Sequence, residues 1–347
     1  MNIMKYRFKN DYSELAHPQV LRDLADIGNK QFEGYGLDEY SAEATDLIQN
    51  KINSHSSDVH FIPGGTHANL IVIASALRPH EAVIATATGH IFMHETGAIE
   101  ATGHKICTRP GINGKLSVSD IKSVLDEHGN DEHMVKPRLV YISMSTECGT
   151  VYTKSELTDI SAFCRSNDLY LYIDGARLGV ALNSYACDLS YEDLVVYTDA
   201  FFIGGTKNGA LFGEAAVIIH EELKKDFRYL LKQRGGLLSK SAAIGLQFKT
   251  LLSAGLYDEL AKHSIATAKK LADGIKSAGY DFLYPVETNL IIPVLPGKLV
   301  KELKKMYGFY DWREMDDMKA VRLLTSWATP ESIIDEFISD LKSISKK

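Results

Sequence analysis

Phe201-Phe202-Ile203-Gly204-Gly205-Thr206-Lys207-Asn208-Gly209 is the most informative segment of this sequence. Its first three residues form an apolar run, which predicts a buried strand, and a lysine follows between glycines. A lysine in that position is expected at the end of a strand and facing a cleft, where its amine can form a Schiff base with an aldehyde. The segment therefore predicts both a piece of a buried sheet and a reactive amine.

A second expected strand also ends in charge, at Tyr172-Ile173-Asp174-Gly175-Ala176-Arg177. Pyridoxal phosphate requires an acid for its pyridine nitrogen and an amine for its aldehyde, and Asp174 and Lys207 are one of each. Taken alone, Lys207 is more often a solvated surface residue, Asp174 a strand-end cap and Arg177 an ordinary surface cation. Their common position at strand ends favours the functional interpretation.

The segment Gly64-Gly65-Thr66-His67-Ala68-Asn69 follows one expected strand and opens an expected helix. Free backbone amides and the positive end of the helix dipole would face outward there, so the turn can bind a phosphate. An isolated Gly-Gly-Thr is more often a plain strand-to-helix turn. The phosphate interpretation therefore depends on the acid and the lysine expected at the ends of the other two strands. Neither GxGxxG nor GxxxxGK[ST] is present, which argues against a dinucleotide or a nucleoside triphosphate.

Composition and charge exclude several classes of partner. The chain has 347 residues and a net charge of -7 without a long block of Lys or Arg, so neither nucleic acid nor an anionic membrane is an expected partner. The charged start is followed by no apolar signal region and no apolar stretch is long enough to span a bilayer, which predicts a cytoplasmic protein. The four cysteines and the scattered histidines lack metal-ligand spacing, so no metal is expected.

Expected strands and helices alternate through roughly the first 220 residues, which predicts an α/β fold with a mainly parallel sheet covered on both faces. The candidate strands are residues 58–62, 82–85, 139–144, 169–174, 200–203 and 215–219. Long charged helices, at 221–233 and 257–278, and a short series of strands and helices follow. We expect a large cofactor-binding domain at residues 25–245, a smaller C-terminal α+β domain at 246–347, and an N-terminal segment, residues 1–24, that packs near the small domain.

Four motifs together resemble the low-specificity L-threonine aldolases, which are pyridoxal-phosphate lyases grouped with the β-eliminating lyases. They are Gly64 to Asn69, Gly89-His90-Ile91 with Glu95-Thr96-Gly97-Ala98, Asp174 to Arg177, and Gly204 to Gly209, and the resemblance covers most of the chain. It implies the aspartate-aminotransferase fold, which is fold type I of the pyridoxal-phosphate enzymes, with a seven-stranded type of sheet in the large domain. It also implies retro-aldol cleavage of L-threonine or L-allo-threonine to glycine and acetaldehyde, a reaction of amino-acid catabolism and glycine biosynthesis.

Carried over position by position, the resemblance gives each cofactor residue a role. Lys207 would form the Schiff base and Asp174 would pair with the pyridine nitrogen. His90 would stack on the cofactor ring, where aminotransferases usually place a carbocyclic or indole ring, and this choice favours an aldolase. The other residues that the resemblance assigns to the cofactor are Gly65 and Thr66 at the phosphate, Thr206, and Arg177.

The resemblance also implies a substrate site formed between subunits. Arg177 and Arg322 match the arginines expected around the substrate carboxylate, which a planar fork of donors binds through two oxygens. Tyr35 matches a segment that reaches the cofactor of a neighbouring subunit, so a homodimer or homotetramer with active sites at the interface is expected. The chain has Asn10 where family members commonly have serine, and Gly236 in a segment where related aldolases can carry a histidine. These departures leave the range of amino-acid substrates open.

A base must remove the β-hydroxyl proton of the substrate, and His90 is nominated, acting directly or through water. Pure stacking without proton transfer is nearly as well supported for His90. His94 lies one helical turn further on, and a structural role is favoured for it. Fixing the substrate carboxylate through Arg177 and Arg322 would select the α-to-β carbon bond for cleavage.

Other functions stay open from the sequence. The same cofactor residues would serve a lyase acting on another β-hydroxy or aromatic amino acid. A homologue that binds pyridoxal phosphate but has lost turnover is a second alternative. A nicotinamide-dependent oxidoreductase is a third, and the missing dinucleotide fingerprint argues against it.

Overall fold

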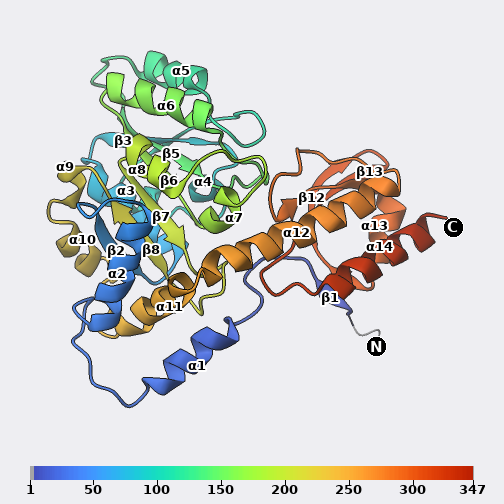
Figure 1. Ribbon diagram of the computed structural model, residues 1–347. Helices are drawn as coiled ribbons and strands as arrows, with labels where there is room; N and C mark the ends of the chain where they lie inside the picture. Colours follow the sequence, from blue (N-terminus) through green and yellow to red (C-terminus); the bar gives the residue numbers. More distant parts are fainter. Residues whose placement is uncertain (1–3, 347) are drawn as a thin grey trace.

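The computed structural model describes residues 4–346 and consists of two α/β parts joined by one long helix (Figure 1). The helix α12 (Leu256–Ser277) runs from the part that holds the large sheet to the C-terminal part. Residues 1–3 and 347, which the predicted N-terminal segment and small domain include, lie outside the described residues.

The remaining elements follow in chain order. The strands are β1 (Tyr6–Arg7), β2 (Asp58–Ile62), β3 (Glu81–Thr86), β4 (Ile106–Arg109), β5 (Lys136–Ser143), β6 (Tyr170–Asp174), β7 (Ala200–Gly204), β8 (Glu214–Ile218), β9 (Leu290–Ile291), β10 (Val294–Pro296), β11 (Tyr307–Gly308), β12 (Tyr310–Met315) and β13 (Met318–Leu324). The helices are α1 (Pro18–Asp26), α2 (Glu39–Lys51), α3 (Gly65–Ala76), α4 (His90–Met93), α5 (Val118–His128), α6 (Lys154–Ser166), α7 (Leu178–Leu182), α8 (Tyr191–Tyr197), α9 (Glu221–Lys224), α10 (Phe227–Gln233), α11 (Ala242–Ser253), α13 (Gly297–Leu303) and α14 (Glu331–Ser345), with a 3₁₀ turn η1 (Glu100–Thr102).

The large sheet has seven strands in the order β2-β8-β7-β6-β5-β3-β4. Strand β8 runs antiparallel to both of its neighbours, and the other pairs are parallel. The predicted α/β class and mainly parallel sheet are confirmed, and each of the six candidate strands is present. Strand β4, which is short and lies at the edge, was not predicted.

Apolar residues on alternate positions of the central strands fill two separate cores, one on each face of the sheet. In β7, Phe201 and Ile203 belong to one core and Phe202 to the other. This alternation follows from the two-residue period of a strand. Because both faces are covered, the strands read as continuous apolar runs in the sequence.

The C-terminal part has its own core and its own small sheet, in which β13 pairs with β9, β10 and β12. Strand β1 pairs with β11, and Phe8 enters this C-terminal core, whereas α1 packs against α11 beneath the large sheet. Residues 4–26 therefore contact both parts, and the domain boundaries at residues 24 and 245 stay predictions.

One predicted helix is wrong in its extent. Residues 221–233 form two short helices, α9 and α10, because Asp226 adopts a left-handed backbone conformation with φ of 59°. Between residues 4 and 346, no helix combines the length and the apolar character needed to cross a membrane.

Candidate active site

A cavity of about 390 Å³ opens where the carboxyl ends of β2, β6 and β7 meet. A smaller cavity of about 190 Å³ adjoins it, shares Lys207 and His90 with it, and extends to Arg322 on β13. The residues predicted from the sequence that line one or both cavities are Gly65, Thr66, His90, Asp174, Arg177, Thr206, Lys207 and Arg322. The structure thus brings together side chains and turns from five separate segments.

The Gly64-Gly65-Thr66 turn forms one end of the larger cavity. Gly64 precedes helix α3 in an extended conformation, and no side chain caps the first turn of that helix. The first amides of a helix have no acceptor within the helix and carry the positive end of its dipole. This end of the cavity therefore offers uncapped amide donors that fit a phosphate group.

Asp174 is the last residue of β6 and is 4% exposed. Its Oδ2 accepts hydrogen bonds from Asn69 Nδ2 at 2.8 Å and from Tyr141 OH at 2.7 Å, and its Oδ1 accepts one from the Ala176 amide at 2.9 Å. Three donors hold the carboxylate in one orientation. A fixed carboxylate at this place fits the protonated nitrogen of a pyridine ring.

His90 begins helix α4, and its Nδ1 lies 2.7 Å from Glu95 Oε1. Asn69 donates through Nδ2 to Glu95 Oε1 as well as to Asp174, so one amide links both carboxylates. One nitrogen or oxygen atom from each of His90, Glu95 and Asp174 lies within 4.8 Å of the others. Burial raises the pKa of Glu95, while the hydrogen bond from His90 lowers it. The arrangement orients the imidazole ring and leaves its Nε2 for another partner.

Lys207 follows β7 and lines both cavities. Its Nζ lies 5.9 Å from the centre of the Tyr12 ring. Burial lowers the pKa of Lys207, and the positive charge of Arg177 lowers it further, against the attraction of Asp11, Asp174 and Glu214. A lower pKa increases the fraction of neutral amine, which is the form that attacks an aldehyde.

Arg177 is buried and forms a two-point ion pair with Asp11, from Nε to Oδ2 at 2.6 Å and from Nη2 to Oδ1 at 3.0 Å. Asn289 adds a third hydrogen bond to Asp11 Oδ2 at 3.0 Å. Burial alone would raise the pKa of Asp11, but the charges of Arg177 and Lys207 and these hydrogen bonds lower it to about 2. Asp11 therefore fixes the guanidinium at the cavity wall.

Arg322 and Glu147 face the smaller cavity and each has an unpaired atom. Arg322 Nε and Glu147 Oε2 are buried without a hydrogen-bond partner. Burial lowers the pKa of Arg322, and burial together with Asp174 raises the pKa of Glu147. Buried polar atoms normally find partners, so these two atoms indicate a place where a polar ligand binds.

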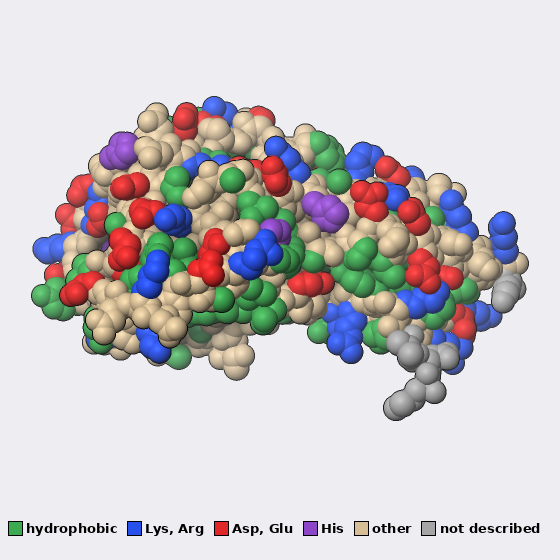
Figure 2. All heavy atoms as spheres, turned by 60° about the horizontal axis from the view of Figure 1, so that its bottom comes forward, with side chains coloured by type: hydrophobic (Ala, Val, Ile, Leu, Met, Phe, Trp, Pro, Cys, Tyr) green, Lys and Arg blue, Asp and Glu red, His purple; other side chains and the backbone are tan. Residues whose placement is uncertain are grey.

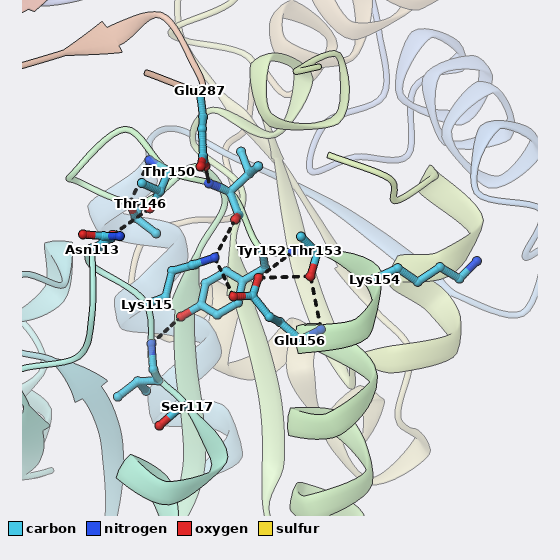
Figure 3. A network of polar contacts seen from close by, with 12 residues as sticks. Asn113, Lys115, Ser117, Thr146, Thr150, Tyr152, Thr153, Lys154, Glu156 and Glu287 are labelled. Carbon is cyan, nitrogen blue, oxygen red and sulfur yellow. Dashed lines mark hydrogen bonds and ion pairs between the residues drawn. The ribbon is translucent and has the colours of Figure 1, made fainter. Parts of the chain in front are cut away.

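The loop that carries Glu147 is held by the polar network in Figure 3. Lys115 Nζ donates to Val151 O at 3.2 Å and to Glu156 Oε1 at 2.6 Å. From the C-terminal part, Glu287 Oε2 accepts a hydrogen bond from the Val151 amide at 2.8 Å. This loop is therefore fixed from both parts of the molecule, which fixes one wall of the smaller cavity.

Two predicted site residues do not line these cavities. Asn10 Oδ1 accepts from the Tyr12 amide at 3.2 Å and from Ser13 Oγ at 2.8 Å, so its side chain stabilises a turn. Tyr35 is 41% exposed, and Lys232 Nζ lies 4.2 Å from the centre of its ring. The predicted roles of both residues in substrate binding stay predictions.

Gly236, a position noted as a departure, lies under tight packing. A β-carbon there would approach Ile71 Cδ1 and Leu231 Cδ1 at 2.6 Å. Any side chain at this position, a histidine included, would therefore require these two terminal methyl groups to shift.

Several polar residues of the cavity region were missed at the level of the sequence. They are Tyr141 and Glu214, and four others, Asp11, Asn69, Glu95 and Glu147, were noticed only as parts of motifs. One local signal could have identified Glu214, which directly precedes the apolar run Ala215-Ala216-Val217-Ile218. An acid rarely enters a buried strand without a partner or a function.

Comparisons with known proteins agree with this site. Residues 27–296 match the family model described as beta-eliminating lyase. A low specificity L-threonine aldolase from a Pseudomonas species is 30% identical over 348 residues, covering 99% of each chain. The solved structure of a Leishmania major threonine aldolase has a TM-score of 0.96 at 47% identity and covers 98% of this chain and 99% of that one. An aspartate aminotransferase from Thermus thermophilus, at 13% identity, has a TM-score of 0.72 over 98% of this chain and 91% of its own, which shows the fold alone.

Proposed function

The chain belongs to the beta-eliminating lyase family, and we propose that it cleaves L-threonine and L-allo-threonine to glycine and acetaldehyde with pyridoxal phosphate as cofactor. The relatives named threonine aldolase support the reaction. The observation that carries the proposal is one cavity lined by a free amine, a fixed carboxylate and an uncapped helix N-terminus.

The residues present fit the cofactor at three points. The amides of Gly65 and Thr66 would hold the phosphate, Asp174 would hold the pyridine nitrogen, and Lys207 would hold the aldehyde as a Schiff base. Bound there, pyridoxal phosphate supplies a ring that accepts the electron pair released when a bond to the substrate α-carbon breaks. Asp174 would keep the ring nitrogen protonated, and His90 lines the same cavity.

The smaller cavity is where we place the substrate carboxylate. Arg322 has an unpaired Nε there, and Arg177 is already oriented by Asp11. Guanidinium groups bind a carboxylate through two parallel hydrogen bonds, which fixes its orientation. His90 would take the β-hydroxyl proton at its Nε2, since Glu95 engages Nδ1.

We further propose that the protein acts in the cytoplasm as a homodimer or homotetramer with active sites at the subunit interface. The four cysteines lie within residues 4–346 and none forms a disulfide, which fits a reducing compartment. Large apolar side chains are exposed at Tyr12, Leu15 and Leu37, and Figure 2 shows hydrophobic side chains at the surface among charges of both signs. Contact with another subunit would remove these side chains from water.

The test is to incubate the purified protein with L-threonine, L-allo-threonine and L-phenylserine, and to measure glycine and aldehyde while recording the absorbance spectrum. We expect cofactor absorbance in the visible range, and acetaldehyde from both threonine isomers. Aldehyde from phenylserine alone would assign a different β-hydroxy amino acid. Cofactor absorbance without any aldehyde would contradict the proposed reaction and indicate a binding protein.

A further inference from the structure

Glu214 is a buried acid of the cavity that the proposed reaction does not use. It is the first residue of β8, which runs antiparallel to β7 and β2, and it pairs with Gly204 at the end of β7 and with Ile62 at the end of β2. Those two strand ends lead into the lysine segment and into the phosphate turn. Glu214 is 4% exposed and lines the larger cavity together with both segments.

Two backbone amides hold Glu214 and Thr206 at adjacent positions. Gly205 N donates to Glu214 Oε2 at 2.8 Å, and Gly213 N donates to Thr206 Oγ1 at 3.1 Å. The pKa of Glu214 is raised to about 7, because the effect of burial outweighs the hydrogen bonds from the Thr206 side chain and the Gly205 amide and the charge of Lys207, which lower it. The acid is therefore poised between its two protonation states near neutral pH.

A threonine hydroxyl has a single hydrogen and two lone pairs. When Glu214 is ionised, the Thr206 hydrogen bonds to the carboxylate, and Thr206 has no donor left for a phosphate. When Glu214 is protonated, its own O–H can donate to Thr206 Oγ1, the Gly213 amide donates to the other lone pair, and the Thr206 hydrogen is free. Only the protonated acid turns Thr206 into a donor toward the cavity.

The charges around Glu214 act on its carboxylate in opposite directions. Lys207 attracts its carboxylate, Asp174 repels it, and the buried hydroxyls of Tyr172 and Tyr257 are the other titratable groups within its influence. A phosphate on the neighbouring turn would add negative charge to the same cavity. Two like charges in a buried site disfavour each other, so a bound phosphate favours the neutral acid.

We propose that Glu214 is a positioning residue of the phosphate-binding site, and that it retains a proton there so that Thr206 donates its hydrogen to the cofactor phosphate. This inference rests on the proposed function, because it takes pyridoxal phosphate as the ligand. It assigns to Glu214 a role in cofactor binding, and it predicts that the cofactor binds together with a proton.

The experiment uses the full chain freed of cofactor, with pyridoxine 5'-phosphate as the probe, because this ligand has the ring and the phosphate but no aldehyde to react with Lys207. Calorimetric titrations between pH 7.5 and 9, in buffers of different ionisation enthalpy, give the dissociation constant and the protons taken up. Unphosphorylated pyridoxine is the ligand control. Glu214→Gln is the test variant, and Glu81→Gln is the matched control, since Glu81 is a second buried carboxylate, accepts a hydrogen bond from the Arg78 amide and lines neither cavity.

We expect the dissociation constant of the unaltered chain to rise about tenfold or more over this range, because one proton is taken up with each ligand. The rise should be much smaller in Glu214→Gln and should persist in Glu81→Gln, and pyridoxine should bind without the extra proton. Equal slopes and equal proton uptake in Glu214→Gln and the unaltered chain would overturn the inference. So would the absence of proton uptake in the unaltered chain, a result that depends on no variant. Failure of pyridoxine 5'-phosphate to bind at any pH would instead overturn the cofactor assignment on which the inference rests.

Discussion

The two walls of the site differ in how completely their polar atoms are paired. On the wall at the end of β6, Asp174 accepts three hydrogen bonds and Asn69 links it to Glu95 and His90, and among these four side chains Glu95 Oε2 is the one buried atom without a partner. On the wall toward the C-terminal part, Arg322 Nε and Glu147 Oε2 are buried without partners. Hydrogen bonds hold the side chains of the first wall in place before any ligand binds. The second wall has buried polar atoms without hydrogen-bond partners, and a ligand can supply those partners.

This difference indicates that the first wall acts on the cofactor and the second wall binds the substrate. A group that acts on a permanent cofactor gains from being fixed in advance, since no reorganisation is then needed during the reaction. A group that binds and releases substrate in each cycle must have hydrogen-bonding atoms that are unpaired when the substrate is absent. Substitutions on the paired wall should therefore lower kcat, and substitutions on the unpaired wall should raise KM.

Lys207→Ala should have the largest effect, because it removes the only group proposed to hold the cofactor covalently. We expect activity to fall by about a thousandfold or more, with loss of the visible absorbance of the bound cofactor. The exposed Lys298→Ala is the control and should leave both unchanged. Retention of absorbance and turnover in Lys207→Ala would remove the central assignment.

Asp174→Asn tests the paired wall directly. The amide keeps the shape of the side chain but removes the charge that stabilises a protonated pyridine nitrogen, so kcat should fall by about a hundredfold or more while KM changes little. Tyr141→Phe removes just one of the three hydrogen bonds and should cost about tenfold. Steady-state kinetics of both variants measure the difference, and equal effects would contradict a role of the charge itself.

His90→Phe separates a base from a stacking ring. Phenylalanine preserves an aromatic face but cannot accept a proton, and we expect cleavage to fall by about a hundredfold with the cofactor still bound. Glu95→Gln, which keeps a partner near Nδ1 but removes its charge, should shift the pH dependence of kcat rather than abolish cleavage. Near-normal cleavage in His90→Phe would leave His90 with stacking alone.

Arg322→Lys tests the unpaired wall. A lysine keeps the positive charge but loses the planar fork of donors, so KM for L-threonine should rise about tenfold while kcat changes less. Glu147→Gln is a useful comparison on the same wall, because it changes a neighbouring unpaired group without touching the guanidinium. An unchanged KM in Arg322→Lys, with a lower kcat, would contradict the assignment of the two walls.

The sequence predicted the sheet and the paired wall better than the unpaired one. Lys207 and Asp174 each follow an apolar strand, and the carboxyl ends of parallel strands meet at one edge, so local pattern alone brings them together. Asp11 is different, because nothing local distinguishes it from Asn10 next to it, and only the tertiary contact with Arg177 buries one and not the other. Glu147 lies in a loop whose position depends on Lys115 and Glu287, which are remote in the chain.

The smallest expected effect concerns the ion pair between Asp11 and Arg177, which fixes the orientation of the guanidinium at the cavity wall. The pKa of Asp11 falls from its usual 3.8 to about 2 in the folded protein, so the pair stabilises the fold above pH 3.8 and this stability is lost as the pH falls through 2. The contribution is about 2 kcal/mol. The difference in thermal midpoint between Asp11→Asn and the unaltered chain should therefore be largest at pH 5 and should shrink toward pH 2.5.

The exposed Asp159→Asn is the control and should show no such trend. A difference that does not depend on pH would mean that Asp11 acts through packing, and Arg177 would then reach its orientation by another route.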